Sequence, residues 1–195
     1  MKVLVACEMS GRVTTEFRRL GHEAYSCDVL PTEGNAAWHI QDDVLKHLND
    51  GWDMMIGHPP CTYLARVGIQ YLYKDPSRWS KMLQGRAFFL ALWSAPVKKI
   101  VLENPVPHRF ASLPPHSQTI QPYEYGHAAS KRTLLWLKNV PPLMATNLVA
   151  DRGEVYQHPG GGHANQKWYS NANSTERAKT FPGIARAMAE QWGTL

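Results

Sequence analysis

The chain has 195 residues, 44% of them hydrophobic, and a formal net charge of +5 at pH 7. A chain of this length fits one domain and carries enough apolar residues for a full core, which excludes an intrinsically disordered protein. The basic balance suits a polyanionic partner, although the lysines and arginines are spread along the chain rather than gathered in one run.

The cysteines and the apolar segments indicate where in the cell the protein is expected. Cys7, Cys27 and Cys61 neither pair closely nor form a Cys-x-x-Cys motif, so neither a disulfide framework nor a cysteine-based zinc site is expected. No apolar segment approaches the roughly 18–20 residues of a membrane span. Glu8 interrupts the apolar amino-terminal run, which is not the profile of a signal peptide. We therefore expect a soluble, cytoplasmic protein.

Short apolar, β-branched runs alternate with amphipathic stretches in the first third of the chain. The predicted strands cover residues 2–6, 23–27, 38–41 (the weakest) and 52–57. A short helix over 13–20 ends at Gly21. A second helix is predicted over 44–49, directly after Asp43.

The second half of the chain continues this alternation. A long helix is predicted over 80–93, and its expected inner face consists of Met82, Leu83, Ala87, Leu90 and Ala91. A buried strand over 99–103 is halted by Asn104-Pro105, and another strand covers 133–137. The last helix, over 184–192, opens after Pro182 and closes at Gly193.

Strands and helices that alternate at this spacing predict an α/β fold with an open, mostly parallel, doubly wound sheet and helices on both faces. In such a sheet, ligands bind beyond the carboxyl ends of the strands. Four notable features fall at strand ends, namely the turn over 7–11, Asp28, Cys61 and Glu103. Their coincidence predicts a functional site at that edge.

Cys61 follows a strand and two consecutive prolines, in the sequence Gly-His-Pro-Pro-Cys. Because prolines lack a backbone N–H and fix φ, the strand cannot continue, and the chain turns into a stiff loop. A thiol held at the end of a strand is well placed to act as a nucleophile. The alternative is that Cys61 is a small buried residue beside a proline turn.

These motifs together resemble the catalytic domain of the DNA cytosine-C5 methyltransferase family, and especially its compact phage and prophage members. The resemblance rests on the Pro-Pro-Cys61 loop, on Glu103-Asn104 at a strand end, and on Tyr125-Gly126 followed by the apolar strand at 134–136. It implies a Rossmann-like S-adenosylmethionine-dependent methyltransferase fold. Residues 1–195 would form a single domain, with a small loop-rich insert at about 139–180 in place of a target-recognition domain.

The resemblance implies methyl transfer from S-adenosylmethionine to C5 of cytosine in DNA. The catalytic residues would be Cys61, Glu103, Lys131 and Arg132. The cofactor would be held by Cys7, Glu8, Ser10, Gly11, Asp28, Asp43 and Pro59. Contacts to the substrate would come from His58, Pro60, Thr62 and Asn104.

The chemistry of the residues is consistent with these roles. Addition of a thiolate to C6 of cytosine makes C5 nucleophilic, and a nearby cation such as Lys131 or Arg132 would favour the thiolate. Glu103, if protonated in a partly buried cleft, could donate to N3 of the base; alternatively it is a surface carboxylate that caps the strand end. Asp28 and Asp43 could instead serve the loop or cap a helix.

Several positions depart from the family pattern. His58 replaces a glycine, Thr62 replaces a glutamine, and Lys131 and Thr133 stand where two arginines are expected. Lysine keeps the charge but loses the bidentate fork of arginine. The turn Glu8-Met-Ser-Gly11 replaces a phenylalanine and two or three glycines.

The small insert limits how many base pairs the protein could read, because extrusion of a base from a duplex needs contacts that hold the gap open. A short or weakly specific site, a single-stranded or nucleotide substrate, or a helper subunit would fit this length. Two other functions remain open: a catalytically inactive nucleic-acid or cofactor binder such as an anti-restriction decoy, and a pyrimidine-modifying enzyme acting on nucleotides or RNA. His158 and His163 have no cysteine or carboxylate partner at ligand spacing, so no metal is expected.

Overall fold

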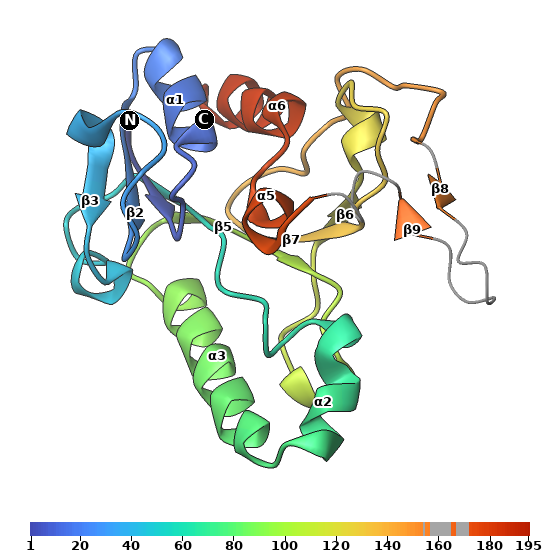
Figure 1. Ribbon diagram of the computed structural model, residues 1–195. Coiled ribbons are helices and arrows are strands. Elements are labelled where there is room, and N and C mark those ends of the chain that lie inside the picture. Colours follow the sequence, from blue (N-terminus) through green and yellow to red (C-terminus); the bar gives the residue numbers. More distant parts are fainter. Residues whose placement is uncertain (154, 157–164, 167–171) are drawn as a thin grey trace.

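A computed structural model describes residues 1–153, 155–156, 165–166 and 172–195 (Figure 1). The strands are β1 (Lys2–Ala6), β2 (Glu23–Asp28), β3 (His39–Gln41), β4 (Met54–Gly57), β5 (Lys99–Pro105), β6 (Gln118–Ile120), β7 (Thr133–Lys138), β8 (Val155–Tyr156) and β9 (Asn165–Gln166). The helices are α1 (Arg12–Arg19), α2 (Ile69–Lys74), α3 (Ser77–Trp93), α5 (Ser174–Ala178) and α6 (Pro182–Trp192). Short 3-10 turns lie at Ala36–Trp38, Val44–Lys46, Arg66–Gly68, Arg109–Ala111 and Pro122–Glu124.

Seven strands form one mixed sheet in the order β3-β2-β1-β4-β5-β7-β6, and β8 pairs with β9 separately. Strands β1 to β5 are mutually parallel, whereas β7 runs antiparallel to both β5 and β6. In register, Ala6 lies opposite Gly57, and Gly57 lies opposite Leu102. The residues that follow Ala6, Gly57 and Leu102 therefore lie side by side at the carboxyl edge of the parallel strands.

The sheet is covered on both faces, because alternate residues of each strand point to opposite sides. On the α1–α6 face, the cluster includes Val3, Val5, Met54, Ile56, Val101, Phe17, Met188 and Trp192. On the α3 face, it includes Leu4, Ala6, Met55, Ile100, Leu102, Met82, Phe89 and Leu92. Figure 1 shows α1 and α6 together on one side and α3 on the other. This confirms the predicted doubly wound α/β fold.

The predicted elements correspond closely to the observed ones. The strands expected over 2–6, 23–27, 38–41, 52–57, 99–103 and 133–137 are β1, β2, β3, β4, β5 and β7. The helices expected over 13–20, 80–93 and 184–192 are α1, α3 and α6. No helix among the described residues combines the length and the apolar character that a membrane span needs.

The helix predicted over 44–49 was wrong, since only the 3-10 turn Val44–Lys46 forms there. The turn ends because the His47 carbonyl accepts the Trp52 indole N–H and the Asp50 amide, and the chain then reverses at Gly51, where φ is 74°.

The predicted inner face of α3 was partly wrong. Met82 is buried as expected, but Leu83 is 55% exposed and Ala87 also faces solvent. Phe89 and Leu92 are buried with Met82 instead. Spacings of seven and three residues keep these three side chains on one side of a helix with 3.6 residues per turn.

Strand β5 extends further than predicted. Asn104-Pro105 was expected to halt the strand, but antiparallel pairing with β7 continues as far as Pro105, which lies opposite Thr133. Asn104 therefore lies within the paired part of β5, opposite Leu134 of β7.

Candidate active site

The loop that carries Cys61 is held by both neighbours of β4. The His58 amide donates to the Ala6 carbonyl of β1 at 2.9 Å. Since Pro60 has no N–H, the loop is secured from the other side: Asn104 Nδ2 of β5 donates to the Pro59 carbonyl at 2.8 Å. Asn104 is 1% exposed. Cys61 thus follows a backbone that two strands hold in place.

His58 and Glu103 form a pair beneath this loop. Nδ1 of His58 lies 3.2 Å from Oε2 of Glu103, and the two side chains are only 9% and 13% exposed. Burial works against the charge of Glu103, but the His58 hydrogen bond and the charge of Lys131 outweigh it, so the pKa of Glu103 lies below its ordinary value. The carboxyl group is therefore ionised at neutral pH in the free protein, whereas the sequence suggested a protonated acid.

The thiol of Cys61 is half-buried next to this pair. Burial and the charge of Glu103 raise the pKa of Cys61, and Lys131 opposes them. The expectation that the site favours a thiolate is therefore not met in the free protein. Lys131 acts in the expected direction, and its Nζ is anchored on the Arg177 carbonyl of α5 at 2.9 Å.

Two buried polar atoms at the site have no hydrogen-bond partner among the described residues. They are Nε2 of His58 and Oδ1 of Asn104. Buried polar atoms in folded proteins are nearly always paired, and these two belong to residues next to the Cys61 loop and Glu103. They are available to a bound polar group.

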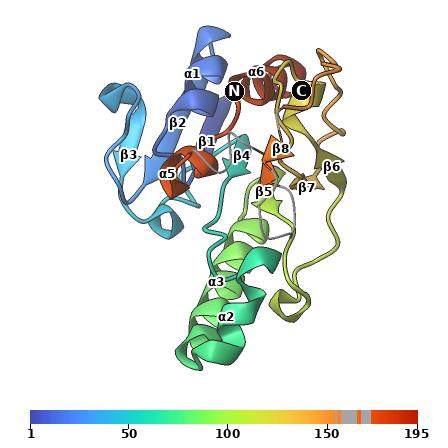
Figure 2. The same ribbon diagram turned by 45° about the vertical axis from the view of Figure 1, so that its right-hand side comes forward.

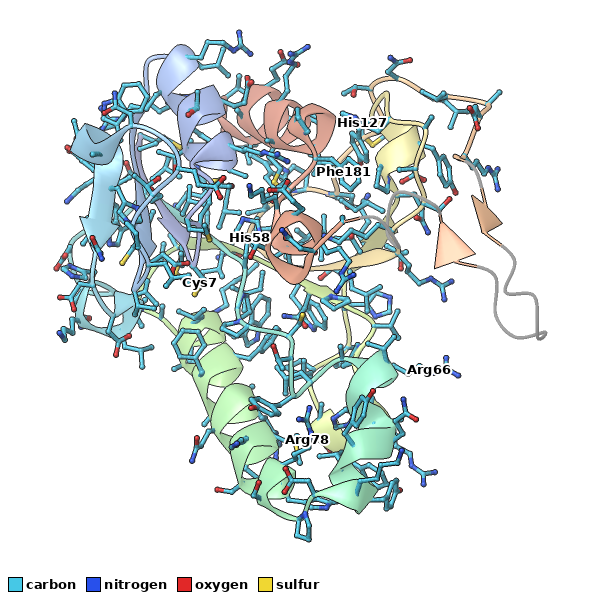
Figure 3. All side chains as sticks on the ribbon, viewed as in Figure 1. Cys7, His58, Arg66, Arg78, His127 and Phe181 are labelled. Atoms are coloured by element: carbon cyan, nitrogen blue, oxygen red, sulfur yellow. The ribbon has the colours of Figure 1, made fainter. Side chains whose placement is uncertain are left out.

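A second group of residues gathers where β1 and β2 end. The Cys7 amide donates to the Cys27 carbonyl at 2.7 Å, and Cys7 has a φ of 58°. Burial raises the pKa of the Cys7 thiol, as do the charges of Asp28, Cys27 and Asp43. The structure thus brings Cys7 near Asp28 and Asp43, three of the residues that the resemblance assigns to the cofactor. In Figure 3, Cys7 and His58 lie at neighbouring positions of this edge.

Each of the two carboxylates also serves its own loop. Oδ1 of Asp28 accepts the Leu30 amide at 3.0 Å, and Oδ1 of Asp43 accepts the Leu45 amide at 3.0 Å. Asp28 and Asp43 therefore have the loop and capping roles that the sequence offered as an alternative to cofactor binding. A carboxylate has further lone pairs, so both residues keep acceptor capacity for hydroxyl or amino groups of a ligand.

Glu8 has a structural task that the sequence reading missed. Its carboxylate accepts the Val13 amide at 2.7 Å, the Thr14 amide at 3.2 Å and the Thr14 hydroxyl at 2.8 Å. The residue is 4% exposed. A buried carboxylate at the amino end of α1 satisfies amides that the helix leaves free. The available signal was an acidic residue four positions before the helix.

The turn before α1 packs against another part of the chain. Gly11 has a φ of 65°, and a Cβ built there would lie 3.2 Å from Cα of Gly34.

Ser10 and Gly11 line a hollow of about 210 Å³ with Pro182 of α6. A larger hollow of about 490 Å³ is lined by α1 and Trp38 and includes no residue of the Cys61–Glu103 group.

The other predicted residues lie as follows. Pro59 is buried, whereas Pro60, Thr62 and Arg132 are exposed. Among the described residues, no three His, Cys, Asp or Glu side chains gather in a way that could hold a metal ion. His158 and His163 lie outside the described residues.

The residues around Cys7 fit part of the cofactor that the sequence resemblance implies. The Asp28 and Asp43 carboxylates at adjacent strand ends suit the hydroxyl and amino groups of a nucleoside. Glu8 does not fit, since its carboxylate is occupied by α1. A nucleoside bound at this edge would therefore find carboxylate acceptors at Asp28 and Asp43 but none at Glu8.

Comparison with known proteins supports the fold. No protein-family model and no curated protein matches the chain. The crystal structure of an Escherichia coli prophage protein, provisionally assigned as a DNA modification methyltransferase, is similar with a TM-score of 0.50 and 16% sequence identity. The match covers 75% of this chain and 51% of that one. The chain thus spans about half the length of this structural neighbour and shares its α/β fold.

Proposed function

We propose that the protein transfers a methyl group from S-adenosylmethionine to C5 of cytosine in DNA, through a transient bond between Cys61 Sγ and C6 of the base. The observation that supports this most is the arrangement of Cys61 beside the His58–Glu103 pair and Lys131 at the carboxyl ends of β4 and β5. A nucleophile, a proton-carrying pair and a cation are what thiol addition to a pyrimidine needs.

The ionised state of Glu103 suggests how the acid forms. The Cys61 thiol loses its proton to the Glu103 carboxylate, directly or through a water, and this step creates the thiolate and the carboxylic acid together. Sγ then bonds to C6, the C5–C6 π electrons move to C5, and Glu103 protonates or polarises N3. Lys131 stabilises the thiolate, since it is the charge that lowers the pKa of Cys61.

The remaining residues hold and release the base. His58 positions the Glu103 carboxyl through Nδ1, while His58 Nε2 and Asn104 Oδ1 are free to bond to the bound nucleotide. After C5 is methylated, a base removes the C5 proton, the C5–C6 double bond re-forms and Cys61 leaves as a thiolate, and N3 gives its proton back to Glu103. S-adenosylmethionine, when bound, supplies an electrophilic methyl group, and we assign its contacts to Cys7, Asp28, Asp43 and Pro59.

The test is a labelled methyl-transfer assay on duplex DNA, single-stranded DNA, RNA and dCMP, with wild type and Cys61→Ser side by side. We expect transfer to DNA by wild type only, and a covalent complex of wild type with a 5-fluorocytosine oligonucleotide that Cys61→Ser does not form. Melting curves of both proteins control for folding. Methyl transfer that survives Cys61→Ser would rule out the thiol mechanism, and transfer to RNA or dCMP alone would replace DNA as the substrate.

A second candidate is a non-catalytic binder that keeps the fold. It is favoured by the raised pKa of Cys61 and by the occupation of the Glu8 carboxylate in α1. A thermal-shift titration with S-adenosylmethionine separates the two candidates. No stabilisation at millimolar cofactor would count against every methyltransferase interpretation, and retained DNA binding would then support the binder.

A further inference from the structure

The positive charge of the protein is concentrated after the Cys61 loop. Residues 58–93 contain Arg66, Lys74, Arg78, Lys81 and Arg86 against Asp75 alone. Five cations and one carboxylate give this segment a net charge of +4, out of +5 for the whole chain. The segment includes α2 and α3, which project away from the sheet as a helical pair in both Figure 1 and Figure 2.

The cations of this helical pair lie over aromatic rings. Arg78 lies 4.7 Å from the ring centre of Tyr63 and 5.4 Å from that of Tyr71. Lys81 is 5.7 Å from Tyr63, and Lys74 is 5.8 Å from Tyr71. Within the described parts of the chain, no carboxylate forms an ion pair with any of these three cations. Asp75 lies close enough for the charges of Lys81 and Arg78 to lower its pKa, but it forms no direct ion pair with them.

Aromatic rings are exposed between these cations. Tyr71 is 46% exposed and Tyr73 is 66% exposed. Tyr73 meets Trp79 and Phe110 edge to face, with ring centres 6.4 and 6.3 Å away. Arg109 lies 4.7 Å above Phe110 and extends the same composition onto the following 3-10 turn. We call Tyr63, Tyr71, Tyr73, Arg78, Lys81 and Arg109 the hairpin surface.

The hairpin surface adjoins the candidate nucleophile. Tyr63 is two residues beyond Cys61. Its carbonyl oxygen forms a hydrogen bond with Nε2 of His108, at 2.9 Å. The amides of Leu64 and Ala65 both donate to the Cys61 carbonyl at 2.9 Å. In Figure 3, Arg66 points outward beside α2, while Arg78 lies between α2 and α3. A polymer that enters the active site at Cys61 would therefore meet these rings and cations next.

We propose that the hairpin surface binds single-stranded DNA on one side of the target nucleotide. Proteins that hold single strands combine cations for the phosphates with aromatic side chains on which successive bases stack. A duplex offers phosphates but keeps its base faces stacked internally, so the exposed rings of Tyr71 and Tyr73 favour the unpaired strand. That the strand is DNA rests on the proposed function; the preference for a single strand rests on the rings and charges.

Tyr73 buries little of its surface in the packing of α2. Leu72, which is 2% exposed, supplies the packing of α2 against the core, whereas Tyr73 leaves two thirds of its surface in solvent. Replacement of Tyr73 therefore tests binding with little effect on folding.

The test is fluorescence anisotropy with labelled oligonucleotides of adenine and thymine only, single-stranded and duplex. These probes contain no cytosine, so binding is measured apart from methyl transfer. We expect single-strand binding that Tyr73→Ala weakens about tenfold or more and that Tyr73→Phe retains. Arg78→Gln should also weaken binding and reduce its dependence on salt. The matched control is Arg19→Gln on α1, which should bind as wild type does.

The proposal would be overturned by duplex bound as tightly as the single strand, by RNA of the same sequence bound more tightly, or by Tyr73→Ala without effect. An equal loss in Arg19→Gln would show a general effect of charge and would also overturn it. Methyl transfer that fails while single-strand binding persists would reject the proposed function alone.

Discussion

The two helical layers of this protein differ in what they bury and in how they use charge. Helix α6 buries six of its 11 residues, whereas α3 buries three of its 17. Beside α1 and α6, Arg19 is paired with Glu16 and Glu190, and Lys179 with Glu33, while Arg18 lies over the Tyr25 ring. On the α2–α3 pair the described ion pairs include none of the cations that lie over aromatic rings.

This difference shows which side stabilises the fold. Packing and ion pairs on the α1–α6 side complete the interactions of that layer within the protein itself. The α2–α3 side, which follows Cys61 in the chain, leaves cations without a carboxylate ion pair among the described residues and aromatic rings exposed to solvent. Substitutions on the first side should therefore change stability, and those on the second should change binding or reactivity.

The largest effect is expected from Glu8→Ala. The substitution removes the acceptor of two buried amides and one hydroxyl at the start of α1. Since each unsatisfied buried donor costs about 1–3 kcal/mol, we expect a loss of about 4 kcal/mol in the free energy of unfolding. Urea denaturation at pH 7 measures it. The control Asp43→Ala removes a cap from a short 3-10 turn and should cost about 1 kcal/mol; equal losses would contradict the prediction.

Gly183→Ala should have the next largest effect. A Cβ at Gly183 of α6 would lie 1.9 Å from the Tyr125 carbonyl oxygen, so the start of the helix must shift. We expect a loss of about 3 kcal/mol, as for an overpacked core position. The same urea titration measures it, and an unchanged midpoint would show that the α1–α6 layer is less tightly packed than described.

Gly85→Ala should have the opposite sign. On α3, a Cβ at Gly85 would lie 3.6 Å from Leu64, which is ordinary van der Waals contact. Because alanine is the better helix former, we expect a gain of up to about 1 kcal/mol. A loss comparable with that of Gly183→Ala would remove the contrast between the two layers.

The smallest effect concerns the reactivity of Cys61 rather than stability. Lys131 lowers the pKa of this thiol, which burial and Glu103 raise. Lys131→Met should therefore raise the pKa further, reduce the thiolate fraction at a given pH and slow alkylation by iodoacetamide between pH 7 and 9. The rate at Cys61 can be followed by mass spectrometry of its peptide. Alkylation as fast as in wild type would mean that Lys131 does not act on the thiol.

Most of the sheet could be predicted from sequence because each long strand is an apolar run with a clear stop. The Pro-Pro pair after β4 is such a stop, and Gly21 marks the end of helix α1 in the same way. The run over 44–49 misled because its length and residues suit a helix, but tertiary contacts of His47 and Trp52 end it after one turn. Helix α2, with six residues, is too short to be stable without its packing on the core.

The candidate site, like the fold, could be predicted from the sequence only in part. Strand ends are local features, so Cys61, Glu103, Asp28 and the turn at Gly11 could be placed at one edge. The contact between His58 and Glu103 joins residues 45 positions apart, and the spacing of motifs does not reveal which side chains meet. The occupation of Glu8 by α1 likewise depends on how the turn folds back, which composition does not specify.

The bond from Asn104 Nδ2 to the Pro59 carbonyl has a consequence for protein engineering. A loop with two prolines has few donors of its own, so its conformation is fixed from the adjacent strand. Anyone who grafts the Cys61 loop onto another α/β scaffold must transplant the end of β5 with it. The transferable unit is a pair of strand ends, and a loop sequence moved alone would lose the position of its thiol.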